Sequence, residues 1–356
     1  MNKTIIKAEV VAHSKNQQGD ELVSLSITFP RMILAEINKH RMLSSNTSSS
    51  RAIPFKKMVE AVQNDPFIPI AWQASHKGMQ GTEYITNEGG RGGDLSRIEV
   101  GWQTALENAI FQAQWMNDYG LTKQLCNRLL EPFMWTTMLI TGSKEGWDNF
   151  FSLRCPQYEI GLQIFKSKKE CVNILRTLQD PSPEILGFDE YDWFSINKGQ
   201  AEIHMMALAE AIYDAMNESK PKELKSGEWH IPFEDKIQLA YTDYDSNGII
   251  TNEGINKKVK ISTAMAARTS YTMVGDEKEI NYEKMVELHD RLIAQDPPHS
   301  SPMEHCARAM SNEEYESFIK GNIDIGFDIP KEAQGWCTNI KGFIPYRYLI
   351  DNNLKM

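Results

Sequence analysis

The sequence has no long apolar run, and this absence excludes most membrane proteins. Nowhere in its 356 residues are there about 18 consecutive apolar residues, the length that a membrane-spanning helix needs. The apolar stretch at the N-terminus is too short for a signal peptide. We therefore expect a cytoplasmic protein without a membrane partner.

Cysteine is also scarce. The five cysteines are scattered and form no C-x-x-C pair, which predicts neither a disulfide framework nor a thiolate zinc site. His299 and His305 have no carboxylate or thiolate partner at ligand spacing, so no metal is expected. Cys155 is interpreted as a buried structural thiol rather than a nucleophile.

Basic residues are outnumbered, with 38 Lys and Arg against 48 Asp and Glu and a net charge of −10. A nucleic-acid binder neutralises many phosphates with a broad basic surface, so polymeric nucleic acid is not expected as a partner. A small anionic ligand in one local basic pocket remains compatible with this charge. The 41% apolar content suffices for a sizeable core.

What the sequence does contain is a mixture of strand and helix patterns. Residues 4–11 and 22–29 have strand patterns, the second alternating apolar residues with Ser or Thr, and the turn residues between them predict a hairpin. The aromatic stretch 336–348 is interpreted as a packed strand. Helical spacing covers residues 30–40, 54–62, 101–119, 121–130, 201–216 and 282–294. This mixture predicts an α+β protein.

The most informative stretch begins with Lys39-His40-Arg41 and ends, after a serine-rich run, with Ser49-Ser50-Arg51. Guanidinium groups bind phosphate through two parallel hydrogen bonds, and small residues let backbone N–H groups approach it. The stretch therefore suits an anionic ligand. A solvated serine-rich loop is the alternative that composition leaves open.

Lys39-His40-Arg41, followed by seven residues and Ser49, is similar to the R-H-R-x7-S signature of the flavin-dependent thymidylate synthases. The departure is Lys39, where the family usually has arginine, so a planar group with two donors is lost. Other segments resemble further motifs of that family: 127–132 (NRLLEP), 149–154 (NFFSLR), 200–203 (QAEI), 262–270 (STAMAARTS) and 298–305 (PHSSPMEH).

The order of these segments differs from that of ordinary family members. Residues 262–270 and 298–305 resemble motifs that precede R-H-R in the family but follow everything else here, so the sequence resembles a circular permutation. If so, the segment up to His305 should lie in space beside the start of the strand at residues 22–29.

The same comparison divides the chain into parts of one catalytic domain. Residues 1–155 form the nucleotide- and flavin-binding part, 156–197 an insertion, 198–240 a helical part and 241–356 the permuted segment. A competing alignment places the QAEI-like motif at residues 156–160, without an insertion but with a poorer continuation.

The resemblance implies an α+β fold with a mixed sheet flanked by helices, and C5 methylation of dUMP. The ligands it implies are FAD, methylene-tetrahydrofolate, NADPH and a pyrimidine deoxynucleotide monophosphate, and the assembly is a homotetramer. The implied catalytic residues are Arg154, Ser49 and His40. The implied substrate-binding residues are Glu36, Ser49, Ser50, Arg51, Arg128 and Arg154. The implied cofactor-binding residues are Lys39, His40, Arg41, Asn149, Ser270 and His305.

Glu36 and Thr47 leave the substrate open, because they stand where the family commonly has glutamine and glutamate. A carboxylate only accepts hydrogen bonds, whereas an amide also donates. Another pyrimidine nucleotide such as dCMP, a hydroxymethyl product, and a non-catalytic scaffold that binds nucleotide and flavin all stay alternatives. Glu36 precedes His40 by one helical turn, so the two should share a helix face, as site residues or as a surface pair.

Overall fold

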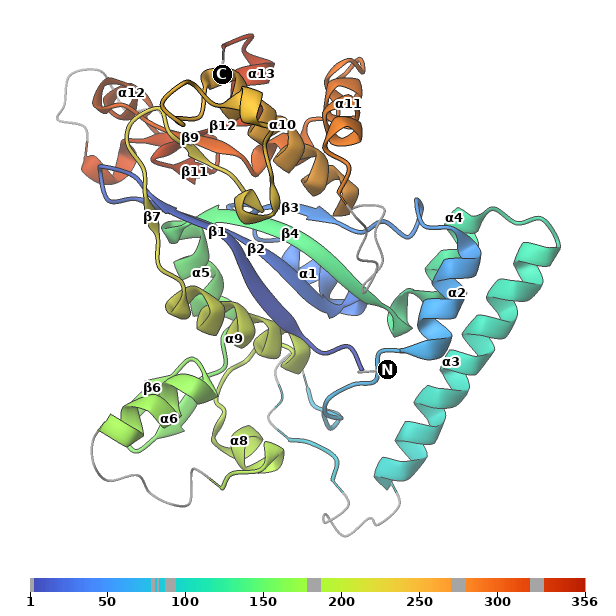
Figure 1. Ribbon diagram of the computed structural model, residues 1–356. Helices are drawn as coiled ribbons and strands as arrows, with labels where there is room; N and C mark the ends of the chain where they lie inside the picture. Colours follow the sequence, from blue (N-terminus) through green and yellow to red (C-terminus); the bar gives the residue numbers. More distant parts are fainter. Residues whose placement is uncertain are drawn as a thin grey trace.

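A five-stranded mixed sheet lies at the centre of the molecule (Figure 1). The computed structural model describes residues 3–77, 81, 83–86, 94–177, 187–269, 280–320 and 330–355. The strands, in spatial order, are β3 (Ser44–Thr47), β4 (Trp135–Ser143), β2 (Glu21–Pro30), β1 (Lys7–Lys15) and β7 (Lys222–Glu223). Neighbours are antiparallel except β1 and β7, which are parallel. The predicted α+β class with a mixed sheet is confirmed.

The predicted hairpin is the pair β1 and β2, with β1 placed somewhat later in the chain than expected. Its turn uses Gly19 at a φ of 92°, a conformation that glycine adopts without steric cost. The alternating residues of β2 point to opposite faces of the sheet. Val23 and Leu25 lie on the apolar face, yet Ser24 on the other face is equally buried. Both faces of the sheet are therefore covered.

Helices cover the apolar face, in the lower half of Figure 1. They are α1 (Leu34–Ile37), α5 (Lys144–Arg154) and α9 (Ile203–Glu218). Glu202 caps α9, because its carboxylate accepts hydrogen bonds from the backbone N–H groups of His204 and Met205. The predicted helix start at residues 200–203 is confirmed, whereas the competing position 156–160 contains a short strand.

The C-terminal part of the chain covers the other face, in yellow to red above the sheet in Figure 1. Its elements are β8 (Trp229–His230), η3 (Glu234–Lys236), η4 (Tyr241–Asp243), α10 (Asn252–Arg268), α11 (Tyr282–Ile293), η6 (Ser301–Glu304), β9 (Ala307–Ala309), α12 (Asn312–Ser317), η7 (Lys331–Ala333), β10 (Trp336–Cys337), β11 (Ile340–Lys341), β12 (Phe343–Pro345) and α13 (Tyr346–Asp351). Residues 336–348 thus form three short strands and a helix start, so the single predicted strand is wrong. A turn at Thr338-Asn339 and a bend at Gly342 separate the strands, and α13 begins directly after Pro345.

A third group of helices stands beside the sheet. It contains η1 (Arg31–Ile33), α2 (Phe55–Asn64), α3 (Asp94–Asp118), α4 (Lys123–Cys126) and η2 (Asn127–Phe133). The helix predicted over residues 121–130 is in fact α4 followed by a 3-10 helix, in which Pro132 cannot donate a backbone hydrogen bond. The helix predicted over residues 30–40 is η1 and α1, which ends at Ile37.

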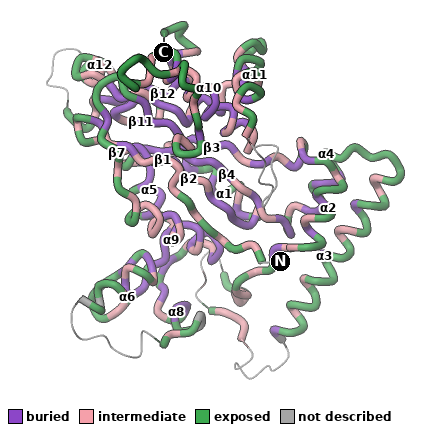
Figure 2. Tube along the Cα trace, in the orientation of Figure 1, coloured by how far each residue is buried: buried purple, intermediate pink, exposed green. Residues whose placement is uncertain are grey.

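The residues expected to form an insertion make a small unit below α9 (Figure 1). Its described elements are β5 (Tyr158–Ile160), β6 (Gln163–Phe165), α6 (Lys168–Thr177) and α8 (Glu190–Ile196). Figure 2 shows that burial concentrates on the sheet and its two covering layers, while α3 and α6 are largely exposed. None of the helices in the described ranges is both long and apolar enough to cross a membrane.

Two histidines of the C-terminal layer are buried against the polar face of the sheet. His230 contacts Ser24 and His305 contacts Thr141, each at 2.8 Å. Burial lowers the pKa of both rings to about 3, and for His230 the nearby His13, His305 and Lys222 lower the pKa further. Both rings are therefore neutral at pH 7.

We expect the free energy of unfolding to fall as the pH is lowered from about 7 to about 5. Unfolded histidine takes up a proton near pH 6.5, whereas His230 and His305 stay neutral until the pH approaches about 3. Between these values the unfolded chain binds more protons, so the stability present above pH 6.5 is lost on acidification. Each ring should lower the free energy of unfolding by about 2 kcal/mol at pH 5.

Urea unfolding at the two pH values measures this loss. The variant His230→Gln should lose less stability between them than the parent chain, by one ring's share. Equal losses in the two proteins would show that His230 is not the neutral buried base described above.

Candidate functional site

Arg154, the last residue of α5, connects two segments that lie far apart in the sequence. Its Nε donates a hydrogen bond to Nε2 of His40 at 3.1 Å, and its Nη1 forms an ion pair with Oε2 of Glu36 at 3.3 Å. We call Glu36, His40 and Arg154 the arginine cluster. All three were predicted site residues, and the fold brings them together.

The expected shared helix face of Glu36 and His40 is wrong, because α1 ends at Ile37. Tight turns follow, in which the backbone N–H of His40 donates to the carbonyl of Ile37. The His40 ring packs edge-on against Phe150 of α5, with ring centroids 4.9 Å apart. Packing on α5, and not helical periodicity, therefore places His40 beside Arg154.

His40 is a neutral hydrogen-bond acceptor in this cluster. Burial lowers its pKa to about 4, and the positive charge of Arg154 adds to this effect. Because Nε2 accepts a hydrogen bond from Arg154, the single ring proton is assigned to Nδ1. The ring therefore orients the guanidinium and carries no charge of its own at pH 7.

The residues before and after His40 in the sequence are exposed, whereas His40 itself is buried. Lys39 and Arg41 are exposed, as are Arg51 and Arg128. Within the part of the chain that the structure describes, Lys39, Arg41 and Arg51 form no ion pair, so their charges are available to an anion.

The serine-rich run is not a solvated loop, because Ser48 and Ser50 are buried. Ser50 Oγ donates to Oε1 of Glu131 at 2.5 Å, and Asn127 Nδ2 donates to the Ser50 carbonyl at 2.6 Å. Arg31 donates to the Ser48 carbonyl at 2.7 Å and pairs with Glu131. The hydroxyl of Ser50 is thus engaged, whereas the neighbouring Ser49 is half-buried.

Arg31 and Glu131 are the anchors of this loop that the sequence analysis missed. Glu131 stands inside the NRLLEP segment, three residues after Arg128, so its position carried a signal. Arg31 directly follows Pro30, and its position carried no such signal in the sequence. Beside the loop lies a groove of about 500 Å³, which is lined by Arg31, Leu34, Asn38, Arg128, Glu131 and Pro132. Arg128 and the serine loop therefore belong to one region of the surface.

The segment ending at His305 packs directly on the sheet. His305 Nδ1 lies 2.8 Å from Thr141 Oγ1 on β4, and the side chain of Asn46 on β3 donates to the carbonyl of Ala266 in α10 at 3.3 Å. After His305, strand β9 packs against Leu22 at the start of β2. The spatial proximity expected for a permuted chain is present.

The remaining predicted residues are placed as follows. Asn149 is exposed on α5, and Thr47 lies on β3, half-buried. Ser270 lies outside the described residues. Cys155 is buried, and burial raises the pKa of its thiol to about 12, so it is no thiolate at pH 7 and fits the predicted structural role. In the described ranges no three His, Cys, Asp or Glu side chains gather as a metal site would require.

No protein-family model and no curated protein matches the sequence. Among solved structures, the chain is similar to the UMP/dUMP methylase PolB from Streptomyces cacaoi bound with 5-Br dUMP, at 13% identity and a TM-score of 0.39, covering 60% of this chain and 90% of that chain. It is also similar to thymidylate synthase X from Helicobacter pylori with FAD and dUMP, at 16% identity and a TM-score of 0.25, covering 50% and 74%. A likeness this distant assigns no activity or ligand to the chain.

Proposed function

We propose that the protein is a flavin-dependent methyltransferase that methylates C5 of a pyrimidine nucleotide, with dUMP as the first candidate. The observation that carries this proposal is that the segments resembling the family's motifs contact one another in the fold. Residues 149–154 meet residues 36–40 through Arg154, and residues 127–132 hold the serine loop through Asn127 and Glu131. Residues 262–270 reach β3 through Ala266. Such convergence is expected of one site in a permuted chain.

The side chains of this region fit the ligands. The exposed Lys39 and Arg41 suit the phosphates of FAD, and Arg51 and Arg128 suit the nucleotide phosphate. Of the neighbouring Ser49 and Ser50, Ser50 has its hydroxyl bound to Glu131, so the hydroxyl of Ser49 is the one available to the nucleotide. FAD would supply the hydride, replenished by NADPH, and methylene-tetrahydrofolate the carbon.

The chain's own contribution is electrostatic. Arg154 stays charged at any working pH, so it stabilises negative charge on the pyrimidine as C5 becomes nucleophilic. His40 accepts a hydrogen bond from Nε of this arginine, and Glu36 accepts one from its Nη1. These two contacts fix the direction of the guanidinium before the ligand arrives, which is the preorganisation that such stabilisation requires.

The position of Glu36 favours a second candidate substrate, dCMP. Glu36 contacts Arg154, the residue proposed to read the base, and its carboxylate can only accept hydrogen bonds. Cytosine presents an amino donor at C4 where uracil presents an acceptor. Mass spectrometry of the products formed from dUMP and from dCMP, each with methylene-tetrahydrofolate, FAD and NADPH, decides between them.

The purified protein should bind FAD, because the exposed cations Lys39 and Arg41 flank His40 of the arginine cluster. Fluorescence titration with FAD measures this directly, with circular dichroism as the check on folding. A folded protein that does not bind FAD would contradict the proposal. A protein that binds FAD and nucleotide but forms no methylated product with either nucleotide would be a scaffold and not an enzyme.

Arg154→Ala should lower turnover by about 100-fold to 1,000-fold, the usual effect of removing a donor that stabilises transition-state charge. The affinity for FAD should change little, since the proposed partner of Arg154 is the pyrimidine. The control is Arg291→Ala, which removes an exposed arginine of α11. Equal losses of turnover and FAD affinity would place Arg154 in the flavin site instead.

The proposed homotetramer needs an apolar interface, and α3 offers one together with Tyr119, which directly follows it. Phe111, Trp115 and Tyr119 follow one another at four-residue spacing and are 61%, 49% and 78% exposed. The double variant Phe111→Ser with Trp115→Ser should therefore have a lower molar mass than the parent chain in sedimentation analysis. Tyr241→Ser, at an exposed tyrosine of η4, is the control and should assemble normally. A monomeric parent chain would contradict the proposal.

A further inference from the structure

Five buried side chains form a continuous line of hydrogen bonds across the sheet. His230 Nδ1 lies 2.8 Å from Ser14 Oγ, and His230 Nε2 lies 2.8 Å from Ser24 Oγ. Ser24 Oγ then lies 2.6 Å from Thr141 Oγ1, which is 2.8 Å from His305 Nδ1. All five residues are at most 3% exposed. We call them the buried chain.

The bonds of the buried chain all point in one direction when each buried hydroxyl proton has an acceptor within the chain. Both rings are neutral at pH 7, because burial lowers their pKa values to about 3. A neutral imidazole has one N–H donor and one lone pair, and each hydroxyl has one proton. If the buried hydroxyl protons of Ser24 and Thr141 both find acceptors within the chain, a donor at one end fixes every donor along it, and only two arrangements remain.

The two ends of the chain decide between these arrangements. Nε2 of His305 is buried and has no partner among the described residues. A bare lone pair there costs less than an orphaned N–H group, because orphaned N–H groups are the rarer defect in folded proteins. This end favours a proton on Nδ1 of His305.

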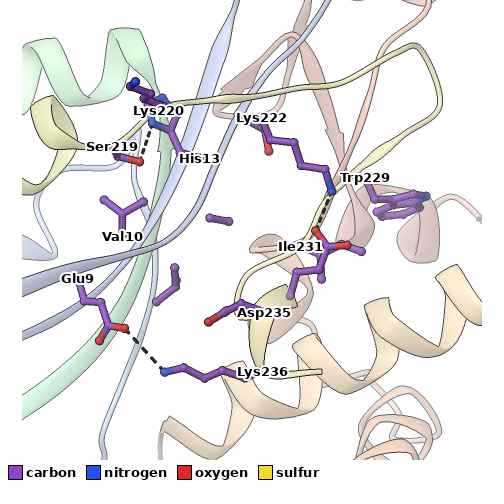
Figure 3. A pocket seen from close by; sticks show the side chains of 14 residues that line it. Glu9, Val10, His13, Ser219, Lys220, Lys222, Trp229, Ile231, Asp235 and Lys236 are labelled. Atoms are coloured by element: carbon purple, nitrogen blue, oxygen red, sulfur yellow. Dashed lines mark hydrogen bonds and ion pairs between the residues drawn. The ribbon is translucent and has the colours of Figure 1, made fainter. Parts of the chain in front are cut away.

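At the opposite end, Ser14 lines a cavity of about 300 Å³ between β1 and η3. Figure 3 shows this cavity, with Glu9, His13, Lys222 and Lys236 among its walls. A hydroxyl proton that Ser14 does not donate to His230 can bind water in such a polar cavity. Both ends therefore favour the arrangement in which the hydrogen bonds are donated from His305 toward Ser14.

We propose that the buried chain holds His305 as its Nδ1–H tautomer and so makes Nε2 a hydrogen-bond acceptor for an N–H or O–H donor. His305 Nδ1 donates to Thr141, Thr141 to Ser24, Ser24 to His230 Nε2, and His230 Nδ1 to Ser14. His230, Ser24 and Thr141 are positioning residues, since they act on a ligand only through His305. The donor is either an N–H group of the flavin, which rests on the proposed function, or an internal water.

Long-range proton–nitrogen NMR of protein with ¹⁵N-labelled histidine measures the tautomer directly. The His305 signal is assigned by its loss in His305→Asn. At neutral pH we expect Nδ1 protonated and Nε2 bare. An Nε2–H tautomer or a doubly protonated ring in the parent protein would overturn the proposal.

Ser24→Ala tests the chain at a distance, because Ser24 does not touch His305. Without Ser24, the hydroxyl of Thr141 loses its acceptor and should turn to donate to His305 Nδ1, so that the tautomer switches to Nε2–H. Ser26→Ala removes a hydroxyl from the same face of β2 outside the chain and should leave the tautomer unchanged. Thr141→Ser, which keeps the hydroxyl, should also leave it unchanged. An unswitched tautomer in folded Ser24→Ala would overturn the proposal.

Titration with FAD separates the two possible donors. If a flavin N–H group binds Nε2, the switched tautomer of Ser24→Ala should weaken FAD binding about tenfold relative to Ser26→Ala. Equal affinities would identify an internal water as the donor. Failure of the parent chain to bind FAD would end the proposed function, while the tautomer measurements would stand unaffected.

Discussion

The central constraint on this structure is that the polar face of its sheet is buried. Ser24 and Thr141 lie on strands whose opposite face packs against α5 and α9, so these strands cannot turn their hydroxyls to solvent. A buried hydroxyl without a partner costs about 1–3 kcal/mol. His230 and His305 meet this requirement from the C-terminal part of the chain. The C-terminal layer is thus tied to the sheet by polar contacts as well as by apolar packing.

The candidate site follows from this attachment. Once His305 is bonded to β4, η6 lies against β3, and α10 comes within reach of Asn46. Strand β3 continues into the serine loop, which Arg31, Asn127 and Glu131 hold from the other side. On the apolar face, α5 presents Arg154 to Glu36 and His40. The elements around the sheet edge therefore combine segments from both ends of the chain.

Charge is distributed unevenly over this region. The interior contains neutral histidines, and two half-buried arginines are paired with carboxylates, Arg31 with Glu131 and Arg154 with Glu36, because isolated charges are costly to bury. The exposed cations lie outside, on Lys39, Arg41, Arg51 and Arg128. This arrangement would separate two tasks of the proposed nucleotide site. The surface cations would attract phosphates, while the arginine cluster would orient the base.

The sequence by itself determined the class of the fold, the hairpin and the helices α2, α3, α9 and α11, because alternation and 3-and-4 spacing depend only on neighbouring residues. It also predicted Glu36, His40 and Arg154 as site residues, and the fold brings these three side chains into contact. It could not determine that His40 leaves the helix to pack on Phe150, nor that Arg31 and Glu131 anchor the serine loop. Nor could it find Ser24, Thr141 and His230, since small polar residues on a strand look like a solvated face. Only the tertiary structure decided these points, because each depends on which distant segment covers a given surface.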